Sequence, residues 1–469
     1  MKIQFFGATQ EVTGSCFLIQ TQSYKILVDC GLLQGSHTKE QKNFEAFPFD
    51  VNEINAVLLT HAHIDHSGKL PLLIKAGFKG KIYTHHATKD LCNIMLQDAG
   101  FLNEKDVEIE NRKRERRGQE LLSPLYTVQD AIQTMSYFET LGYGIKQEII
   151  RNISIKLSDA GHILGSAIIE VWLSEGGVTR KVVFSGDLGR KDMPILRDPS
   201  IIKNADLVLM ESTYGDRGLP RWEENLKQFS DIILEARQSK GNILIPSFAV
   251  GRSQEILYSF YDNFNTLNLN NSLIFLDSPM AIKVTEVYAK HWNLYDKAAR
   301  NIVKTSGSPY KLPNLRLCVD TADSMGINQI KQGAIIIAGS GMCNGGRIRH
   351  HLKHNIWRKQ CHLIFVGYQA ESTLGRRILE GAKEINLWGE QIQVSAKVHM
   401  VNGFSAHADQ TGLLNWYGHF NNLPPLILVH GEINAMNNLA QEIYNRYTVH
   451  PWIPKYKDEY DLIKRKPIH

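Results

Sequence analysis

Three histidines and one aspartate are concentrated in the segment THAHIDHSG, residues 60–68, which follows the apolar run NAVLLT. Because side chains alternate along an extended chain, His61 and His63 can point their rings to the same side. Asp65 and His66 follow on the turn into the amphipathic segment SGKLPLLIKAG. Four such donors so close together would repel or be desolvated without a cation, so the spacing predicts a metal site of the kind that zinc occupies.

The number of donors in this segment indicates two adjacent metal ions. A catalytic zinc normally takes three protein ligands and keeps one position open, so four donors need further partners to complete a pair of ions. The candidates are His162 in DAGHILGSA, Asp187 in FSGDLG and His430 in LILVHGE. Each of these three, taken alone, is as readily a buried residue that only satisfies backbone groups.

Short runs of β-branched residues must position these donors. Runs such as YKILVD, KVVFSGD, GNILIPS and GAIIIAGS alternate with longer segments of helical periodicity. Each run ends in Gly, Ser, Asp or His, which are typical of turns. We therefore expect an α/β fold of buried strands and covering helices, with its functional loops at strand ends.

The composition limits the classes of protein to consider. The 469 residues are 43% apolar and 22% charged, which is typical of a globular chain, and the net charge of +5 permits a polyanionic partner without requiring one. The six cysteines form no CxxC pair, so we predict neither a thiolate zinc site nor a disulfide framework. No secretion signal and no run of about 18 apolar residues is present, so we expect a cytoplasmic protein without a membrane span.

The order of the motifs resembles a known family. HAHIDH, preceded by VDCG and followed by GHILGS and SGDLG, resembles the metallo-β-lactamase fold. The chain then carries ESTYGDR, IPSFAVGRSQE, LDSPMA, GSGMCNGGR, GYQAESTLGR, GFSAHAD and LVHGE. This series resembles the β-CASP branch, the nucleases that include the pre-mRNA 3′-end endonuclease and ribonuclease J. The resemblance covers nearly the whole chain.

The resemblance implies a fold with an insertion. A four-layer αββα metallo-β-lactamase domain would be interrupted by an inserted α/β β-CASP domain, a parallel sheet flanked by helices. The implied boundaries are residues 1–207 for the first part, 208–388 for the insertion and 389–469 for the second part.

The resemblance also implies two zinc ions per chain. One would bind His61, His63 and His162, the other would bind Asp65, His66 and His430, and Asp187 would lie between them. Asp29 of VDCG matches a carboxylate that accepts a proton from a ligand imidazole and fixes its ring. The alternative for Asp29 is a strand-end residue that only caps a turn.

The implied reaction is phosphodiester hydrolysis by a hydroxide shared between two zinc ions, to which Asp65 would contribute as a catalytic residue. His407 resembles the general acid that protonates the leaving oxygen, and Glu211 resembles the carboxylate that keeps this imidazole protonated. An acidic strand-end residue that only caps a helix is the alternative for Glu211.

Two glycine-flanked segments are candidates for binding substrate phosphates. The residues are Ser340 and Arg347 in GSGMCNGGR, and Ser372, Thr373 and Arg376 in GYQAESTLGR. Many relatives have glycine where this chain has Ser372. Plain strand-to-helix turns with caps are the alternative for both segments.

The family resemblance indicates the substrate. Members that act on DNA tend to have valine at the position of His430, so histidine favours RNA, and a flexible single strand is easier to accommodate than a duplex. Ribonuclease J carries a further C-terminal domain that we do not expect here, so we favour an endonuclease and leave 5′-exonuclease activity open. A homodimer and RNA-processing partners also stay open.

Two other functions remain to be distinguished. A small-molecule hydrolase that cleaves a thioester or a lactone would use the same metal ligands, but it leaves ESTYG, GFSAHAD and the insertion unexplained. A catalytically silent RNA-binding subunit would be expected to lose metal ligands, and this chain retains all seven.

Overall fold

The computed structural model describes residues 1–468, which form two compact units. Unit 1 comprises Met1–Lys191, Asp198–Gly218 and the chain from His407 onward, and unit 2 comprises Asp192–Arg197 and Leu219–Ala406. Each unit has its own sheets and its own apolar core.

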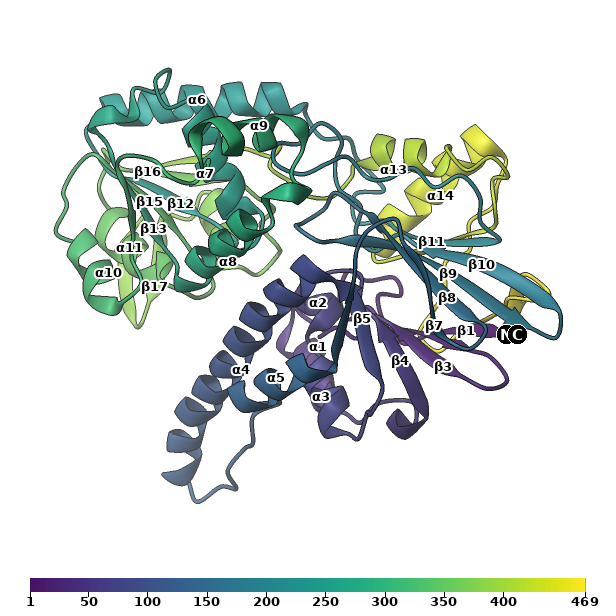
Figure 1. Cartoon of the computed structure of the whole chain (residues 1–469). Helices are drawn as coiled ribbons and strands as arrows, with labels where there is room; N and C mark the ends of the chain where they lie inside the picture. The colour runs from purple at the N-terminus through teal and green to yellow at the C-terminus, as the bar shows by residue number, and fades with distance from the viewer. Residues whose placement is uncertain (469) are drawn as a thin grey trace. The chain divides into compact units, whose positions relative to one another are not determined.

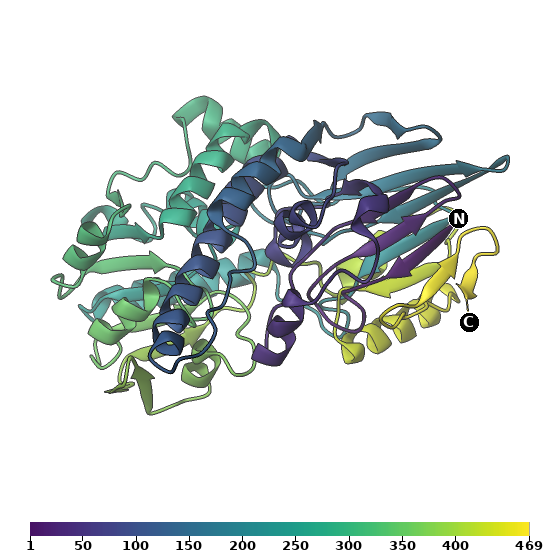
Figure 2. The same ribbon diagram turned by 90° about the horizontal axis from the view of Figure 1, so that it is seen from below.

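Unit 1 contains an eight-stranded sheet in which antiparallel pairing gives way to parallel pairing after β3. In spatial order its strands are β22 (Lys466–Ile468), β21 (Glu459–Asp461), β1 (Lys2–Phe5), β2 (Phe17–Gln20), β3 (Lys25–Val28), β4 (Ile54–Leu58), β5 (Lys81–His85) and β6 (Phe138–Leu141). Because β1 pairs with β21, the two ends of the chain lie close together, as Figures 1 and 2 show.

The second sheet of unit 1 has six strands and is parallel only at one end, where β10, β11 and β20 run together. In spatial order its strands are β20 (Leu426–Val429), β11 (Leu207–Glu211), β10 (Val178–Phe184), β9 (Ala167–Glu175), β8 (Ile153–Asp159) and β7 (Lys146–Ile150). Since β8 and β10 are both antiparallel to β9, the carboxyl ends of β8, β10, β11 and β20 meet at one edge.

The two sheets of unit 1 pack face to face around one apolar core. Alternate residues of β8, among them Ile153 and Ile155, are fully buried against residues of the first sheet such as Ile3. The opposite face of the second sheet, including Met210, packs on α13 and α14 through side chains such as Leu439. Helices α2 to α5 lie on the side of the first sheet (Figure 1), so unit 1 has the predicted αββα layers.

The helices of unit 1 are mostly short, with one long exception, α4. They are α1 (His37–Gln41), α2 (Ile64–Ser67), α3 (Leu70–Lys75), α4 (His86–Glu115), α5 (Val128–Thr134), α13 (Gln410–Tyr417) and α14 (Ile433–Tyr447), with 3-10 turns η1 (Lys42–Phe44), η2 (Val51–Glu53) and η3 (Met135–Tyr137). Within the described residues, none is both long enough and apolar enough to cross a bilayer.

Unit 2 is built on a six-stranded sheet that is parallel throughout. In spatial order its strands are β14 (Leu315–Leu317), β13 (Leu273–Asp277), β15 (Ala334–Ala338), β12 (Ile243–Pro246), β16 (His362–Phe365) and β19 (Lys397–Met400). The central strands read ILIP, AIIIA and HLIF and are buried along their whole length. Such runs are typical of parallel strands that are covered on both faces.

Helices cover both faces of the unit 2 sheet (Figure 1). They are α6 (Trp222–Gln238), α7 (Arg252–Asp262), α8 (Pro279–Lys290), α9 (Lys297–Ser306), α10 (Thr321–Ile327), α11 (Ile348–Asn355) and α12 (Leu374–Leu379), with 3-10 turns η4 (Leu269–Asn271) and η5 (Trp292–Leu294). A hairpin of β17 (Glu384–Leu387) and β18 (Glu390–Gln393) follows α12. The predicted class, an α/β domain with a parallel sheet flanked by helices, is confirmed.

The boundaries between the units lie later in the sequence than the expected 207/208 and 388/389. Strand β11, which begins at Leu207, pairs with β10 and β20 and so belongs to unit 1. Strand β19, which begins at Lys397, pairs with β16 and so belongs to unit 2. Motif positions alone do not reveal these two pairings, because the strands have only five and four residues and pair with strands far away in the sequence. The six cysteines are all buried free thiols. The cytoplasmic location expected from the sequence stays a prediction.

A close approach of two backbone segments joins β3 to the histidine segment in unit 1. The N–H of Cys30 donates to the carbonyl of His66 at 2.8 Å, and Gly31 packs on the same segment. A Cβ added to Gly31 would lie 1.6 Å from the carbonyl oxygen of Asp65, so no side chain fits there unless the backbone moves.

Replacing Gly31 with alanine should therefore lower the free energy of unfolding by about 1–3 kcal/mol, the usual range for overpacking a tightly packed site. Denaturant unfolding measures this value. Gly142→Ala is the matched control, since an added Cβ there makes only an ordinary contact at 3.7 Å. Equal stability of the two variants would contradict the expectation.

Candidate metal centre

The predicted metal ligands come together because they follow the carboxyl ends of strands in unit 1. The segment HAHIDH follows β4, and His63 is the N-cap of the short helix α2. His162 follows β8, Asp187 follows β10 and His430 follows β20, at the shared edge of the second sheet. Residues far apart in the sequence therefore meet at one place, as expected for loops at strand ends.

The first group consists of His61, His63, His162 and Asp187, whose donor atoms lie within 4.8 Å of one another. His63 Nδ1 is 3.1 Å from His61 Nε2 and 3.2 Å from His162 Nε2. Asp187 Oδ2 is 3.4 Å from His61 Nε2 and 3.5 Å from His162 Nε2. Three imidazole nitrogens and one carboxylate oxygen thus surround one point.

The second group consists of Asp65, His66 and His430. The Nε2 atoms of His66 and His430 are 3.1 Å apart, and His430 Nε2 is 3.4 Å from Asp65 Oδ2. Asp187 Oδ1 is 3.3 Å from His66 Nε2 and 3.6 Å from His430 Nδ1. The two oxygens of Asp187 therefore face different groups, and the seven residues fall into the two sets expected from the sequence.

The chemistry of these donors fits cations. Burial lowers the pKa of His61 and His162, and it lowers the pKa of His63 to about 3, so these imidazoles are neutral and keep a lone pair. Burial alone would raise the pKa of Asp187, but the charges of His430 and His66 hold it well below its usual range. Asp187 Oδ1 is buried and makes no hydrogen bond. Buried carboxylates beside neutral imidazoles are the donor set that a divalent metal takes.

Asp29 fixes one of these rings from behind. It has a φ of +59° directly after β3, and its Oδ2 accepts a hydrogen bond from His66 Nδ1 at 2.7 Å. Its carboxylate also accepts from the backbone N–H and the hydroxyl of Thr60, both at 2.8 Å. His66 Nε2 is thereby directed into the cluster, as metal-binding histidines require. On the other side, Thr213 Oγ1 lies 3.1 Å from His430 Nδ1 and holds that ring.

His407 lies beside the first group and forms a pair with Glu211. Its Nδ1 is 3.2 Å from Glu211 Oε1 and 4.0 Å from Asp187 Oδ2. Burial disfavours the charged imidazolium, but the charge of Glu211 and its hydrogen bond outweigh burial and raise the pKa of His407 to about 9. Glu211 is itself held by the backbone N–H groups of Leu188 at 2.7 Å and Thr213 at 3.2 Å. The arrangement provides a protonated imidazole next to the predicted metal ligands.

The five predicted substrate-binding residues lie in unit 2, and most of their polar groups are engaged locally. Arg347 donates to Asp277 Oδ1 at 2.8 Å and to the carbonyls of Cys318 and Val319. Arg376 donates to Glu380 at 2.7 Å. The two arginines therefore have carboxylate partners within unit 2.

The three hydroxyl residues of the same segments differ from one another. Ser340 Oγ bonds both the carbonyl and the N–H of Gly345 at 3.2 Å. Thr373 is the N-cap of α12 and donates to the carbonyl of Ala370 at 2.7 Å. Ser372 is exposed and lines a small cavity with Arg349 and Arg377, two arginines that no sequence motif indicated. Substrate binding by the five predicted residues stays a prediction.

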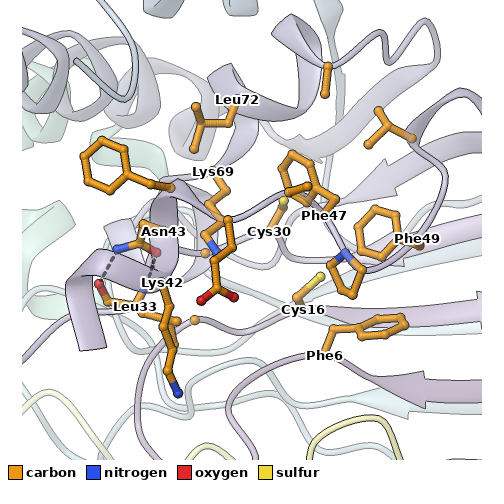
Figure 3. Close-up of a pocket in the computed structure, with 18 of the residues that line it drawn as sticks. Phe6, Cys16, Cys30, Leu33, Lys42, Asn43, Phe47, Phe49, Lys69 and Leu72 are labelled. Atoms are coloured by element: carbon orange, nitrogen blue, oxygen red, sulfur yellow. Dashed lines mark hydrogen bonds between the residues drawn. The ribbon is translucent and has the colours of Figure 1, made fainter. Parts of the chain in front are cut away.

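A large cavity of about 1030 Å³ lies in unit 1 (Figure 3). Cys16 and Cys30 are part of its lining, and Figure 3 shows the rings of Phe6, Phe47 and Phe49 around them. Lysine side chains, including Lys69, enter the same cavity. None of the predicted site residues lines it. Three of its aromatic residues, Phe44, Phe47 and Phe49, are close in sequence, but Phe6 and Tyr456 come from the two ends of the chain, and no motif connects them.

Family models match three parts of the chain. The metallo-β-lactamase superfamily model matches residues 9–128. The β-CASP domain model matches residues 253–378. A model described as a Zn-dependent metallo-hydrolase RNA specificity domain matches residues 391–454.

Curated relatives match along most of their length. A ribonuclease from Thermus thermophilus is 38% identical over 92% of this chain and 93% of its own. Transcription termination factor FttA from Methanococcus maripaludis is 31% identical over 95% of this chain and 69% of its own. FttA from Thermococcus kodakarensis is 32% identical over 98% and 71%.

A solved structure from Enterococcus faecalis, of a protein of unknown function, has a TM-score of 0.54 at 12% identity and covers 98% of this chain and 99% of its own. At that identity the likeness concerns the fold alone. The curated relatives and the matched models carry the assignment further. The chain belongs to the β-CASP family of the metallo-β-lactamase superfamily and is a metal-dependent hydrolase.

Proposed function

We propose that the protein is a ribonuclease that binds two zinc ions and cleaves single-stranded RNA at internal phosphodiester bonds. The observation that carries this proposal is the buried cluster of seven donors, in which Asp187 faces both groups and a protonated His407 lies alongside. RNA as the substrate is supported by the name of the Thermus relative, a ribonuclease, and by the matched RNA specificity domain.

The residues that would hold the metals follow from the two groups. His61, His63 and His162 would hold one ion, and Asp65, His66 and His430 would hold the other, with one oxygen of Asp187 on each. When bound, the two ions supply Lewis acidity, which activates a water and neutralises charge that develops on the phosphate. Asp29 and Thr213 would keep the rings of His66 and His430 in place.

His407 would donate the proton that the leaving oxygen needs. It belongs to neither histidine group, its ring centroid is 4.5 Å from that of His162, and its Nδ1 lies 3.2 Å from Glu211 Oε1. The negative charge of Glu211 favours the imidazolium near neutral pH. Asp187, Glu211 and His407 also lie within ligand distance of one another, so metal content must be measured beside activity.

The lining of the large cavity in unit 1 also suits a single strand of RNA. Phe44 is 63% exposed at its edge, and the rings of Phe47, Phe49 and Phe6 form a continuous series with centroids 5.3 to 5.4 Å apart. Aromatic faces stack with unpaired bases and lysines meet phosphates, which is how single-stranded nucleic acids are commonly bound.

The first test of this function is cleavage of a circular single-stranded RNA, which has no end for an exonuclease. We expect linear product with the metal-loaded protein. We expect none after chelation, because the proposed cleavage depends on the metals that the seven donors would bind. A denaturing gel separates circle from linear RNA. An uncut circle together with digestion of linear RNA would replace the endonuclease proposal with an exonuclease.

The second test counts the metals. His63 Nδ1 lies near both other imidazoles of its group, so His63→Ala should lose about one zinc ion per chain and nearly all RNA cleavage. Elemental analysis gives the metal content, and the exposed His419 supplies the control variant His419→Ala. Two ions retained in a fully active His63→Ala protein would refute the assignment.

The third test concerns the proton donor. His407→Ala should keep both metals and its RNA affinity, yet cleave roughly 100-fold to 10,000-fold more slowly, the usual contribution of general acid catalysis. Glu211→Gln should also slow cleavage, and the double variant should be little slower than His407→Ala, since residues that act as a unit are not additive.

A sulfur-substituted RNA separates this role from a structural one. A thiolate leaves without a proton, so sulfur at the bridging leaving position should restore most of the rate of His407→Ala while leaving the parent little changed. If the variant stays equally slow on the sulfur substrate, or if its loss follows missing metal, His407 is not the proton donor.

A further inference from the structure

A small cavity of about 290 Å³ lies in unit 2 among α11, α12 and the β17–β18 hairpin. Its polar lining consists of Asn344, Arg349, Ser372, Arg377 and Asn386. Cys343 and Leu374 complete the wall, and no acidic side chain takes part. The lining therefore carries two positive charges and no negative charge.

The two arginines of this cavity have no carboxylate partner within the described residues. Arg349 is held instead by Trp388, with its guanidinium carbon 4.8 Å from the ring centroid, and its Nε is buried without a hydrogen-bond acceptor. A buried donor without an acceptor is unfavourable, and a bound anion is one of the few explanations for it. The neighbouring Arg347 and Arg376 both have carboxylate partners, so the two pairs of arginines differ in kind.

The two asparagines also present donors. Asn344 Oδ1 accepts from the N–H of Leu374 at 2.9 Å, and Asn386 Oδ1 accepts from the N–H of Gly389 at 3.0 Å. Because each amide oxygen is already used by a backbone N–H, the NH2 group is what each side chain retains. With the two guanidinium groups and the hydroxyl of Ser372, every polar side chain of the lining can donate a hydrogen bond to a ligand.

Ser372 occupies a backbone conformation that glycine would adopt more easily. Its φ is +67°, in the left-handed region, where a side chain is disfavoured. Glycine would relieve this strain, yet the chain has a serine whose hydroxyl lines the cavity. A polar side chain kept at an unfavourable φ is consistent with a role in binding.

We infer that this cavity binds a phosphate group, with Arg349 and Arg377 as its charged partners and Asn344, Asn386 and Ser372 as neutral donors. Guanidinium groups bind phosphate through paired hydrogen bonds, and the cavity volume accommodates one phosphate with its ester oxygens. That RNA supplies this phosphate rests on the proposed function. That the cavity binds a phosphate rests on its lining alone.

The test measures binding of a labelled single-stranded RNA to Asp65→Asn protein, which should bind without cleaving. Adding Arg349→Ala and Arg377→Ala should weaken binding roughly tenfold or more at low salt, the effect expected for lost hydrogen bonds to a charged group. The slope of log affinity against log salt should become shallower by about 0.7, the value for one phosphate of a single strand. The exposed pair Lys304→Ala and Arg316→Ala removes the same charge elsewhere in unit 2 and should leave both values unchanged.

Two milder changes test whether the alanine pair loses RNA affinity only because it misfolds. Arg349→Lys with Arg377→Lys keeps the charge but not the paired hydrogen bonds, so its affinity should lie between those of the parent and the alanine pair. Ser372→Gly keeps the backbone conformation and removes only the hydroxyl, so it should weaken binding slightly at undiminished thermal stability. An alanine pair that is folded and binds RNA with the parent's affinity and salt slope would overturn the inference.

Inorganic phosphate separates this inference from the proposed function. Titration calorimetry should detect phosphate binding to the parent and not to the Arg349→Ala, Arg377→Ala pair. If the parent binds no RNA, the proposed function fails, and the phosphate titration alone decides on the cavity: heat lost in the alanine pair supports it, and equal heats overturn it. RNAs with and without a 5′-phosphate then show whether a terminal or an internal phosphate is bound.

Discussion

The close packing of buried imidazoles and carboxylates in unit 1 is the constraint on which the rest of that unit depends. Nε2 atoms of His66 and His430 lie 3.1 Å apart, and an oxygen of Asp187 is buried between them without a hydrogen bond. Such an arrangement is unfavourable in a protein interior unless a cation compensates it. Burial opposes a positive charge on His66, but the negative charges of Asp187 and Asp29 outweigh burial and raise the pKa of His66 well above its usual range. What attracts a proton there also attracts a metal ion.

The fold meets this constraint through its strand ends. Four strands of the second sheet direct their carboxyl ends to one edge, so donors from distant parts of the sequence converge without long loops. Asp29 and His430 both follow a strand directly with φ values of +59° and +51°, which turns their side chains toward the cluster. For Asp29 the cost of this conformation is offset by three short hydrogen bonds to Thr60 and His66. Strain is thus located where the donors must be oriented.

Much of this centre could be predicted from the sequence because its signals are local. HAHIDH lies within six residues, and His162, Asp187 and His430 each follow an apolar run, which made them candidates. The family resemblance then implied the two sets in which the structure groups them. The fold class followed from the same runs. The boundaries of the insertion did not, because membership of β11 and β19 in a sheet depends on which distant strands they pair with.

Side-chain contacts in unit 2 also depend on residues that are distant in the sequence, so motifs do not predict them. Arg347 and Arg349 are two residues apart and equally basic, yet only Arg347 meets Asp277, which lies 70 positions earlier in the chain. Whether a guanidinium is neutralised depends on that tertiary contact. The orientation of an amide is likewise decided by the backbone N–H that its oxygen meets, as with Asn344 and Leu374. Motifs identified the segments, but they did not distinguish which of their arginines lines a cavity.

The raised pKa of His407 beside the predicted metal ligands has an electrostatic cause. Burial among other imidazoles would lower its pKa, as happens at His162, so the proton stays on His407 only if a carboxylate is committed to it. Asp187 also favours the charged imidazolium, but it lies farther from His407, at 4.0 Å, and its oxygens face the two donor groups. Glu211 lies closer, at 3.2 Å, and the N–H groups of Leu188 and Thr213 hold its carboxylate outside those groups. Glu211 is therefore the carboxylate nearest to His407, whereas Asp187 faces both candidate ligand groups, although the two carboxylates share one buried site.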